Sequence, residues 1–497
     1  MAVAIVILPL MSVFFREESE RILPLLTVFF LSLFFVANAC LTKRPKVRID
    51  KTTIFLIIFL IWCFANTAIL GRSVGVNPIA KWVCVLLVFL FSDQLKEHRR
   101  AILYGLLISG LFQGVVVMLQ SLHLLHSFSA YFPVSGTFSN PNHAACLIGL
   151  SCAIGLYLGK WKWLSIVTFF ALVLCGSRGN VLGVAIIVCV LLWHKLLNKS
   201  KNKAVIYVAG SFAMAALAVL LVVLYRLNVD SADGRILIWR VCLSGIGNHP
   251  ISGAGFGSVA ADYMYLQAEW IRNHPDSSLL LLADNNRYCF NEILHLLFEQ
   301  GVIGLALMCI VLYRSLRRAE ITVLAGVSFL LISSLTLYTA DIFPVFLSFW
   351  LLLALGKPQE KALFEINRPF YIALGIACIL FSIHYINRKE VLPFPNYEKT
   401  CNEGEEYLES GDYDEAENRF LLAMDMIPSR LYAPYRLFKM YVEYGEKEKA
   451  RAIGEKILSM RVKVFGNTTI QVREEVRKWM TSAARGEKIS VKENGTN

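Results

Sequence analysis

The sequence predicts an all-α protein, in which a polytopic integral membrane helix bundle is followed by a helical-repeat domain outside the membrane. Hydrophobic residues make up 56% of the 497 residues and charged residues only 17%, a balance typical of membrane proteins. Apolar runs long enough to cross a hydrocarbon core of about 30 Å recur over residues 1–387. From Tyr397 onward the chain is charged and helical in pattern. We therefore expect a transmembrane domain over 1–387 and a tail domain over 388–497.

The apolar runs predict about thirteen transmembrane helices. Several runs are only 14 or 15 residues long, so the predicted number of helices is accurate to within about one. The first run has no basic segment before it and no small-residue cleavage site, which favours an anchored helix over a signal peptide. The interval 226–291 is expected to form one long extramembrane loop. The runs lie at 2–15, 22–41, 53–70, 78–92, 101–122, 143–159, 163–175, 181–194, 204–225, 292–313, 321–338, 342–356 and 370–386.

The basic residues of the short loops predict the orientation of these helices, because basic loops of membrane proteins face the cytoplasm. The basic loops are 42–51, 93–100, 195–203 and 314–320. Strict alternation then places the other loops on the outer side, and these are 71–77, 123–142, 176–180, 226–291 and 339–341. An odd number of helices sends the tail outside, which in a diderm bacterium is the periplasmic side of the inner membrane. The net charge of +12 thus reports topology, and nucleic acid is not an expected partner.

The cysteines agree with a membrane protein. Nine of the twelve lie in apolar runs, where they serve as small core residues. Cys242, Cys289 and Cys401 reach the outer side, and a Cys242–Cys289 disulfide is one possibility there. No pair of cysteines has the CxxC spacing of a zinc site, so no metal is expected.

The tail carries a repeat. Gly445 and Ala450 follow Gly411 and Ala416 at a spacing of 34 residues, the period of a tetratricopeptide helix pair. Two such repeats bury little core by themselves. Residues 397–460 are therefore either a helical spacer that docks on the membrane domain or a platform for a periplasmic protein partner. The remaining positions of the pattern are Tyr413, Phe420, Ala423 and Pro428.

Several polar residues on the outer side are candidates for a binding site. Asn140 and Asn142 open a helix, Arg178 precedes another, and Arg235 and Arg240 lie in the long loop. Each residue also has a structural explanation. Asparagines at such positions commonly cap helices, and such arginines can serve as interfacial anchors or as solvated loop charges. Arginine held near hydrocarbon is costly unless it meets an anion. Their shared side of the membrane therefore points to a lipid-linked diphosphate as the ligand of Arg178, Arg235 and Arg240.

A set of short motifs in this order resembles a known family over roughly residues 120–356. The motifs are Thr137-Phe138-Ser139-Asn140-Pro141-Asn142, Ser177-Arg178-Gly179, Arg235 with Trp239, His249-Pro250 with Gly253 and Gly255, and Asn291, Leu294, Glu299, Gly301 and Gly304. The family is that of the O-antigen ligase-related integral membrane glycosyltransferases, which include O-antigen ligases, O-antigen polymerases and bacterial protein O-oligosaccharyltransferases. The resemblance implies transfer of a glycan from undecaprenyl diphosphate to a hydroxyl of lipid A core, a glycan or a protein, without metal or cofactor. A tetratricopeptide tail is also similar to members of this family.

One position departs from the family pattern. The residue before Asn291 is usually a histidine assigned to acceptor activation, and here it is Phe290. Helix periodicity indicates a substitute for the missing histidine, because Glu292, His295 and Glu299 fall within about 60° of one another on one face of the helix. Carboxylates that flank an imidazole orient it as a general base. The alternative is that this polar face only packs against a neighbouring helix.

The expected reaction is an inverting glycosyl transfer. Cleavage at the anomeric carbon leaves negative charge on the diphosphate, which guanidinium groups bind in bidentate fashion. Two other classes stay open. A lipid-glycan transporter needs charged residues along several helices, and these are scarce, whereas a non-catalytic scaffold that recruits glycan enzymes is compatible with Phe290.

Overall fold

The computed structural model describes residues 19–41, 47–159, 162–199, 203–386, 388, 394–463 and 466–485. The expected first span, 2–15, and the loop positions 42–46 and 200–202 lie outside these residues. The chain forms two compact units. The first consists of residues up to 228 together with 249–256 and 289–392, and the second of 229–248, 257–288 and 393–497.

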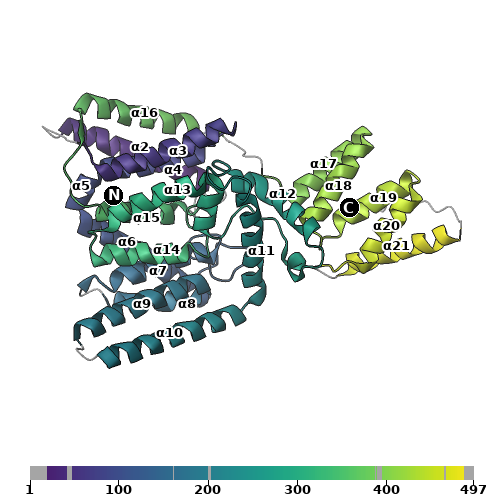
Figure 1. The fold of residues 1–497 in the computed structure, drawn as a ribbon, viewed down its shortest axis with the longest axis horizontal. Coiled ribbons are helices and arrows are strands. Elements are labelled where there is room, and N and C mark those ends of the chain that lie inside the picture. The colour runs from purple at the N-terminus through teal and green to yellow at the C-terminus, as the bar shows by residue number, and fades with distance from the viewer. Residues whose placement is uncertain are drawn as a thin grey trace. The chain divides into compact units, whose positions relative to one another are not determined.

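The first unit is a bundle of helices (Figure 1). A helix occupies most of each expected apolar run from 22–41 onward, so the helical class is confirmed for the described residues. Among the described residues, six helices are long and apolar enough to cross a membrane, and five others are apolar but shorter. The protein is thus a multi-pass membrane protein, while the total of about thirteen spans stays a prediction. The helices are α2 (Ser19–Leu41), α3 (Lys51–Ile69), α4 (Val76–Leu90), α5 (Ser92–Glu97), α6 (Arg99–Ser121), α7 (Pro141–Gly155), α8 (Leu164–Leu174), α9 (Arg178–Lys199), α10 (Lys203–Arg226), α13 (Glu292–Leu316), α14 (Ile321–Ser333), α15 (Phe343–Gly356) and α16 (Arg368–Ile386).

The structure adds one small β-ribbon that the sequence pattern does not indicate. Strand β1 (Val47–Ile49) pairs antiparallel with β2 (Phe364–Ile366). Asp50 follows β1 and caps α3, because its carboxylate accepts a hydrogen bond from the Thr53 N–H. The Lys357 ammonium lies 2.7 Å from the same carboxylate and is almost fully buried. This ion pair ties the ribbon to the end of α15.

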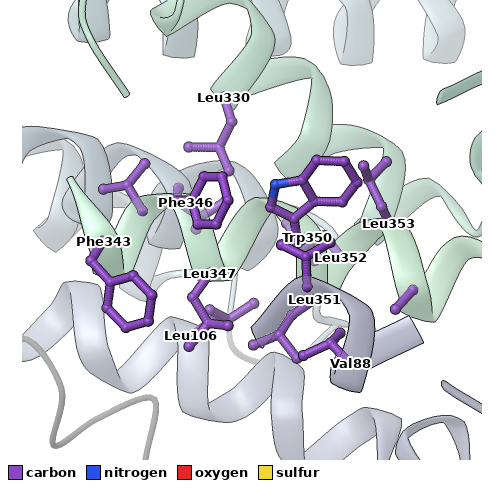
Figure 2. Packing of buried hydrophobic residues seen from close by; sticks show 14 of the residues in the cluster. Val88, Leu106, Leu330, Phe343, Phe346, Leu347, Trp350, Leu351, Leu352 and Leu353 are labelled. Carbon is purple, nitrogen blue, oxygen red and sulfur yellow. The ribbon is translucent and has the colours of Figure 1, made fainter. Parts of the chain in front are cut away.

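Helix α15 is the centre of the bundle. It is apolar on all sides, as expected of a helix surrounded by others, and Figure 2 shows its side chains packed against Val88 of α4, Leu106 of α6 and Leu330 of α14. Trp350 is 2% exposed. Its ring meets Trp82 edge-on, with 5.3 Å between the ring centroids. This packing fixes α4, α14 and α15 relative to one another.

Helix α13 is interrupted at Gly301, whose φ of +63° and ψ of −169° lie outside the helical region. The carbonyl groups freed by the break accept hydrogen bonds from the segment 249–256. The Ala254 N–H donates to Phe298 O and the Gly255 N–H to Glu299 O, each at 2.8 Å. In return, the Val302 N–H donates to Pro250 O at 3.0 Å. The break therefore satisfies its backbone groups within protein, as hydrocarbon surroundings require.

Close backbone approach explains the glycines of this segment. A Cβ on Gly301 would lie 2.2 Å from Ile251 O, and a Cβ on Gly253 would lie 2.4 Å from the Gln300 nitrogen. Helix α3 holds the same segment from another side, since the Asn66 amide donates to Ser252 O at 2.8 Å. Gly253 and Gly301 therefore allow the backbone of the segment 249–256 to pack directly against α13.

The second unit combines helices from the interval 226–291 with the tail. This interval is expected to be a loop, but it contains α11 (Val229–Ile246), α12 (Ser258–Asn273) and the 3-10 helix η3 (Ser278–Leu282). Helix α12 packs against tail helix α18. The Gln267 amide donates to Met426 O at 2.8 Å. The tail helices are α17 (Tyr397–Ser410), α18 (Tyr413–Met426), α19 (Tyr432–Glu443), α20 (Lys447–Ser459) and α21 (Asn467–Ala484).

The repeated residues of the tail occupy equivalent places. Gly411 and Gly445 follow α17 and α19, and both have positive φ, +83° and +75°, a conformation that favours glycine at the end of a helix. Ala416 and Ala450 are both fully buried. The assignment to tetratricopeptide repeats and the protein partner for residues 397–460 stay predictions.

Candidate functional site

Three helices of the first unit begin close together. Asn140 caps α7 by accepting a hydrogen bond from the Asn142 N–H. The Ser177 hydroxyl, just before α9, donates to Asn142 Oδ1 at 2.7 Å. The Glu292 N–H, at the start of α13, donates to Ser334 O at 2.9 Å. A Cβ on Gly179 would lie 2.4 Å from the Thr336 hydroxyl, so α9 also abuts the segment after Ser334. Helix N-termini carry positive partial charge, and here they share one end of the bundle.

An imidazole lies between two carboxylates on the first turns of α13. His295 Nε2 is 3.2 Å from Glu299 Oε1, and His295 Nδ1 is 3.6 Å from Glu292 Oε2. The side chains of Glu292 and His295 are each 21% exposed, whereas that of Glu299 is 9% exposed. The sequence periodicity predicts this shared face. Carboxylates on both nitrogens orient the ring, and such an arrangement can accept or relay a proton.

The loop between α14 and α15 is longer than expected and covers residues 334–342. The predicted span 321–338 is too long, because α14 ends at Ser333. The Tyr338 hydroxyl of this loop lies 3.1 Å from His143 Nε2 and accepts a hydrogen bond from the Asn140 amide at 3.4 Å. Its ring meets that of Phe290 edge-on, with 5.1 Å between centroids. Phe290, at the usual histidine position, thus packs against Tyr338, and its φ of +50° is unusual for a non-glycine residue.

One charged residue that is not among the predicted site residues approaches the same loop. Lys81 of α4 donates to Ala340 O at 3.2 Å and lies 3.5 Å from Asp341 Oδ1. The Ala340 N–H donates to Glu292 Oε1 at 2.9 Å. The signal available in the sequence is that Lys81 is the one charged residue within the α4 sequence, since ionisable residues in membrane helices mark functional sites.

The three candidate arginines do not form one cluster within either unit. In the first unit, the Arg178 guanidinium donates to Leu224 O and Asn228 O, both at 2.9 Å, and so caps the end of α10. Arg235 and Arg240 belong to α11 in the second unit. Five residues along a helix correspond to about 140° of rotation, so their side chains leave different faces of α11. Diphosphate binding by these arginines stays a prediction.

The candidate asparagines have structural contacts. Asn291 caps α13, because its side-chain oxygen accepts hydrogen bonds from the Ile293 and Leu294 N–H groups. Asn140 and Asn142 link α7 to Tyr338 and Ser177. Cys242 and Cys289 are both buried, and the disulfide between them stays a prediction. Within the described residues no group of three His, Cys, Asp or Glu side chains is arranged to hold a metal ion.

The fold and the site define a multi-pass helical membrane protein with a carboxylate–imidazole–carboxylate arrangement where three helices begin. Residues 163–309 match the family model described as O-antigen ligase, and this match supports an O-antigen ligase-related family for the chain. The matched segment runs from α8 into α13 and includes Arg178, Arg235, Arg240, His295 and Glu299. Members of this family are glycosyltransferase-like enzymes of polysaccharide assembly. No curated protein matches the chain.

Proposed function

We propose that this protein transfers a glycan from undecaprenyl diphosphate to an acceptor hydroxyl at the periplasmic face of the inner membrane. The observation that carries the proposal is His295, which lies between Glu292 and Glu299 inside the family-matched segment. Ionisable residues in an apolar membrane helix are costly and mark functional sites. A role as the general base that accepts the proton of the acceptor hydroxyl would explain why α13 carries them. The acceptor class is that of an O-antigen ligase, with a polymerase or protein O-oligosaccharyltransferase as the alternatives.

The chemistry assigns a role to each end of this arrangement. As the acceptor oxygen attacks the anomeric carbon, its proton passes to the His295 imidazole or to a flanking carboxylate, and the bond to the diphosphate oxygen breaks. A single displacement inverts the anomeric carbon. Glu299 is the more buried carboxylate, so it suits the stabilisation of the imidazolium that forms. Glu292 is held by the Ala340 N–H and orients the other nitrogen.

The departing diphosphate needs positive charge. Arg178, Arg235 and Arg240 supply guanidinium groups in this proposal, and the N-termini of α7, α9 and α13 add their partial charge. The Arg178 contacts are backbone carbonyl oxygens. A phosphate oxygen is a stronger, charged acceptor for the same donors, so substrate binding would exchange these contacts. Asn140 and Asn142, at the start of α7, would contact the glycan.

The glycans of a deletion strain distinguish the acceptors. Loss of a ligase leaves lipid-linked polymer, loss of a polymerase leaves single repeat units, and loss of a protein transferase removes glycan from proteins only. A second measurement addresses the other classes. Purified protein with lipid-linked glycan and acceptor should form product, whereas movement of intact lipid-linked glycan across vesicles without product would indicate a transporter. The absence of both activities would favour a scaffold.

A further inference from the structure

We infer that Lys81 is a positioning residue for the site, because it fixes the loop residue that holds the Glu292 carboxylate. This inference rests on the proposed function. Lys81 is far from α13 in the sequence. It contacts the site through residues 340 and 341 of the loop between α14 and α15.

The environment of Lys81 shows that its charge is held in place. Its side chain is 14% exposed, and it is the one charged residue within the α4 sequence. A partly buried ammonium in a membrane helix is costly unless it is paired. The pairing is with Ala340 O at 3.2 Å and with the Asp341 carboxylate at 3.5 Å. The Phe346 ring centroid lies 6.0 Å from the same ammonium.

Residue 340 is held from both sides. Its carbonyl accepts from Lys81, and its N–H donates to Glu292 Oε1 at 2.9 Å. The start of α13 is tied to the same loop a second time, since the Glu292 N–H donates to Ser334 O. With Oε1 held in this way, Oε2 faces His295 Nδ1 at 3.6 Å. The position of Lys81 therefore sets the position of the carboxylate that orients the imidazole.

The inference makes a specific kinetic prediction for the full-length protein. Lys81→Met should lower kcat by up to about a hundred-fold, the scale of a misplacement near the reacting groups, and should leave KM for the lipid-linked donor unchanged. Lys81→Arg keeps a cation for Ala340 O and should restore most of kcat. Lys96→Met is the matched control, because Lys96 is 13% exposed and also lies 3.5 Å from an aspartate, Asp93. This control should leave kcat unchanged.

A double variant tests whether Lys81 acts through Glu292. If it does, Lys81→Met combined with Glu292→Gln should be no slower than Glu292→Gln alone, since coupled residues are not additive. Losses that multiply, or an equal loss in Lys96→Met, would overturn the inference.

Hydrogen exchange supplies a readout that is independent of turnover. Lys81→Met should speed exchange of the Ala340 amide and of the first turn of α13, whereas Lys96→Met should not. Unchanged exchange at these amides would overturn the positioning role even if the wild-type protein transfers glycan. If Lys81→Met exchanges faster while the wild-type protein shows no transferase activity, the positioning role is supported and the proposed function is refuted.

Discussion

The Nε2 atom of His295 lies 3.2 Å from Oε1 of Glu299, one turn further along α13. This contact pairs an imidazole with the more buried of its two neighbouring carboxylates. It provides the basis for the first prediction.

His295→Ala and Glu299→Gln should each lower transfer about a hundred-fold or more, the scale of a lost general base. Phe290→Ala should keep a substantial fraction of activity, because Phe290 packs on Tyr338 and has no proton to exchange. Turnover of purified variants with lipid-linked glycan checks this. Full activity of His295→Ala with a dead Glu292→Gln would make Glu292 the base. Full activity of both would mean that α13 supplies no base.

Arg235→Lys should lower transfer substantially, because lysine keeps the charge but not the bidentate fork. Loss of the guanidinium in Arg235→Ala removes a transition-state contact of roughly 3 kcal/mol, which corresponds to about a hundred-fold in rate. Arg240 is exposed on α11, and Arg240→Ala should have a smaller effect. The rates of the three purified variants decide the assignment, and wild-type turnover by Arg235→Ala would refute it.

Gly301→Ala should disrupt the support of α13. The added Cβ would meet Ile251 O at 2.2 Å and the Gly253 nitrogen at 2.6 Å, so the backbone must shift. Gly71→Ala is the control, since Gly71 also has a positive φ, +67°, but open space around its Cβ position. We expect a lower thermal midpoint and little transfer for Gly301→Ala only. Equal losses in both variants would indicate backbone strain alone as the cause.

The second unit should weaken at acidic pH. Burial raises the pKa of Asp284, but hydrogen bonds from Lys463 and the Asn285 N–H and the charge of Arg430 outweigh it and hold this pKa below its ordinary value of 3.8. A lowered folded-state pKa stabilises above the unfolded value, and this stabilisation is lost as pH falls through the folded value. Hydrogen exchange of residues 278–288, corrected for intrinsic rates, should therefore stay slow down to about pH 4 and rise below it.

Asp284→Asn removes the titrating group from this cluster. Its exchange over residues 278–288 should be faster at neutral pH and should respond less to acid. Asp276 is exposed in the same unit, and Asp276→Asn should behave like the wild type. An acid response that survives in Asp284→Asn would assign the effect to other carboxylates, of which Glu398 also pairs with Arg430.

The predicted orientation can be tested by thiol labelling in intact spheroplasts. Cys401 is 1% exposed and should not react, so an exposed tail position such as Glu409 is the better reporter. In a background without the exposed Cys40 and Cys309, an impermeant reagent should label Glu409→Cys and spare Lys199→Cys. Labelling of Lys199→Cys but not of Glu409→Cys would show that the predicted orientation is wrong.

The sequence predicts the membrane helices because hydrocarbon imposes long apolar runs. It also predicts that His295 meets Glu292 and Glu299, since helix periodicity alone brings them together. The helices α11 and α12 are missed because their composition is that of soluble helices and the interval 226–291 has no apolar run long enough to cross a membrane. Lys81, Tyr338 and Ala340 are missed for another reason. Their contacts join distant positions, such as His143 and Tyr338, which are 195 residues apart, and Lys81 and Ala340, which are 259 residues apart. No local pattern in the sequence reports such pairs.

The second unit is assembled from stretches of chain that are made at different times. Helix α12 packs on α18, and the Gln267 amide bonds to Met426 O, yet α13 to α16 lie between them in the sequence. During synthesis, α12 must therefore wait without its core partner until four further membrane-associated helices have left the ribosome. A chain that stops before α18 would leave the apolar side of α12 exposed permanently. Removal of the tail should therefore produce a protein that cellular proteases recognise and degrade.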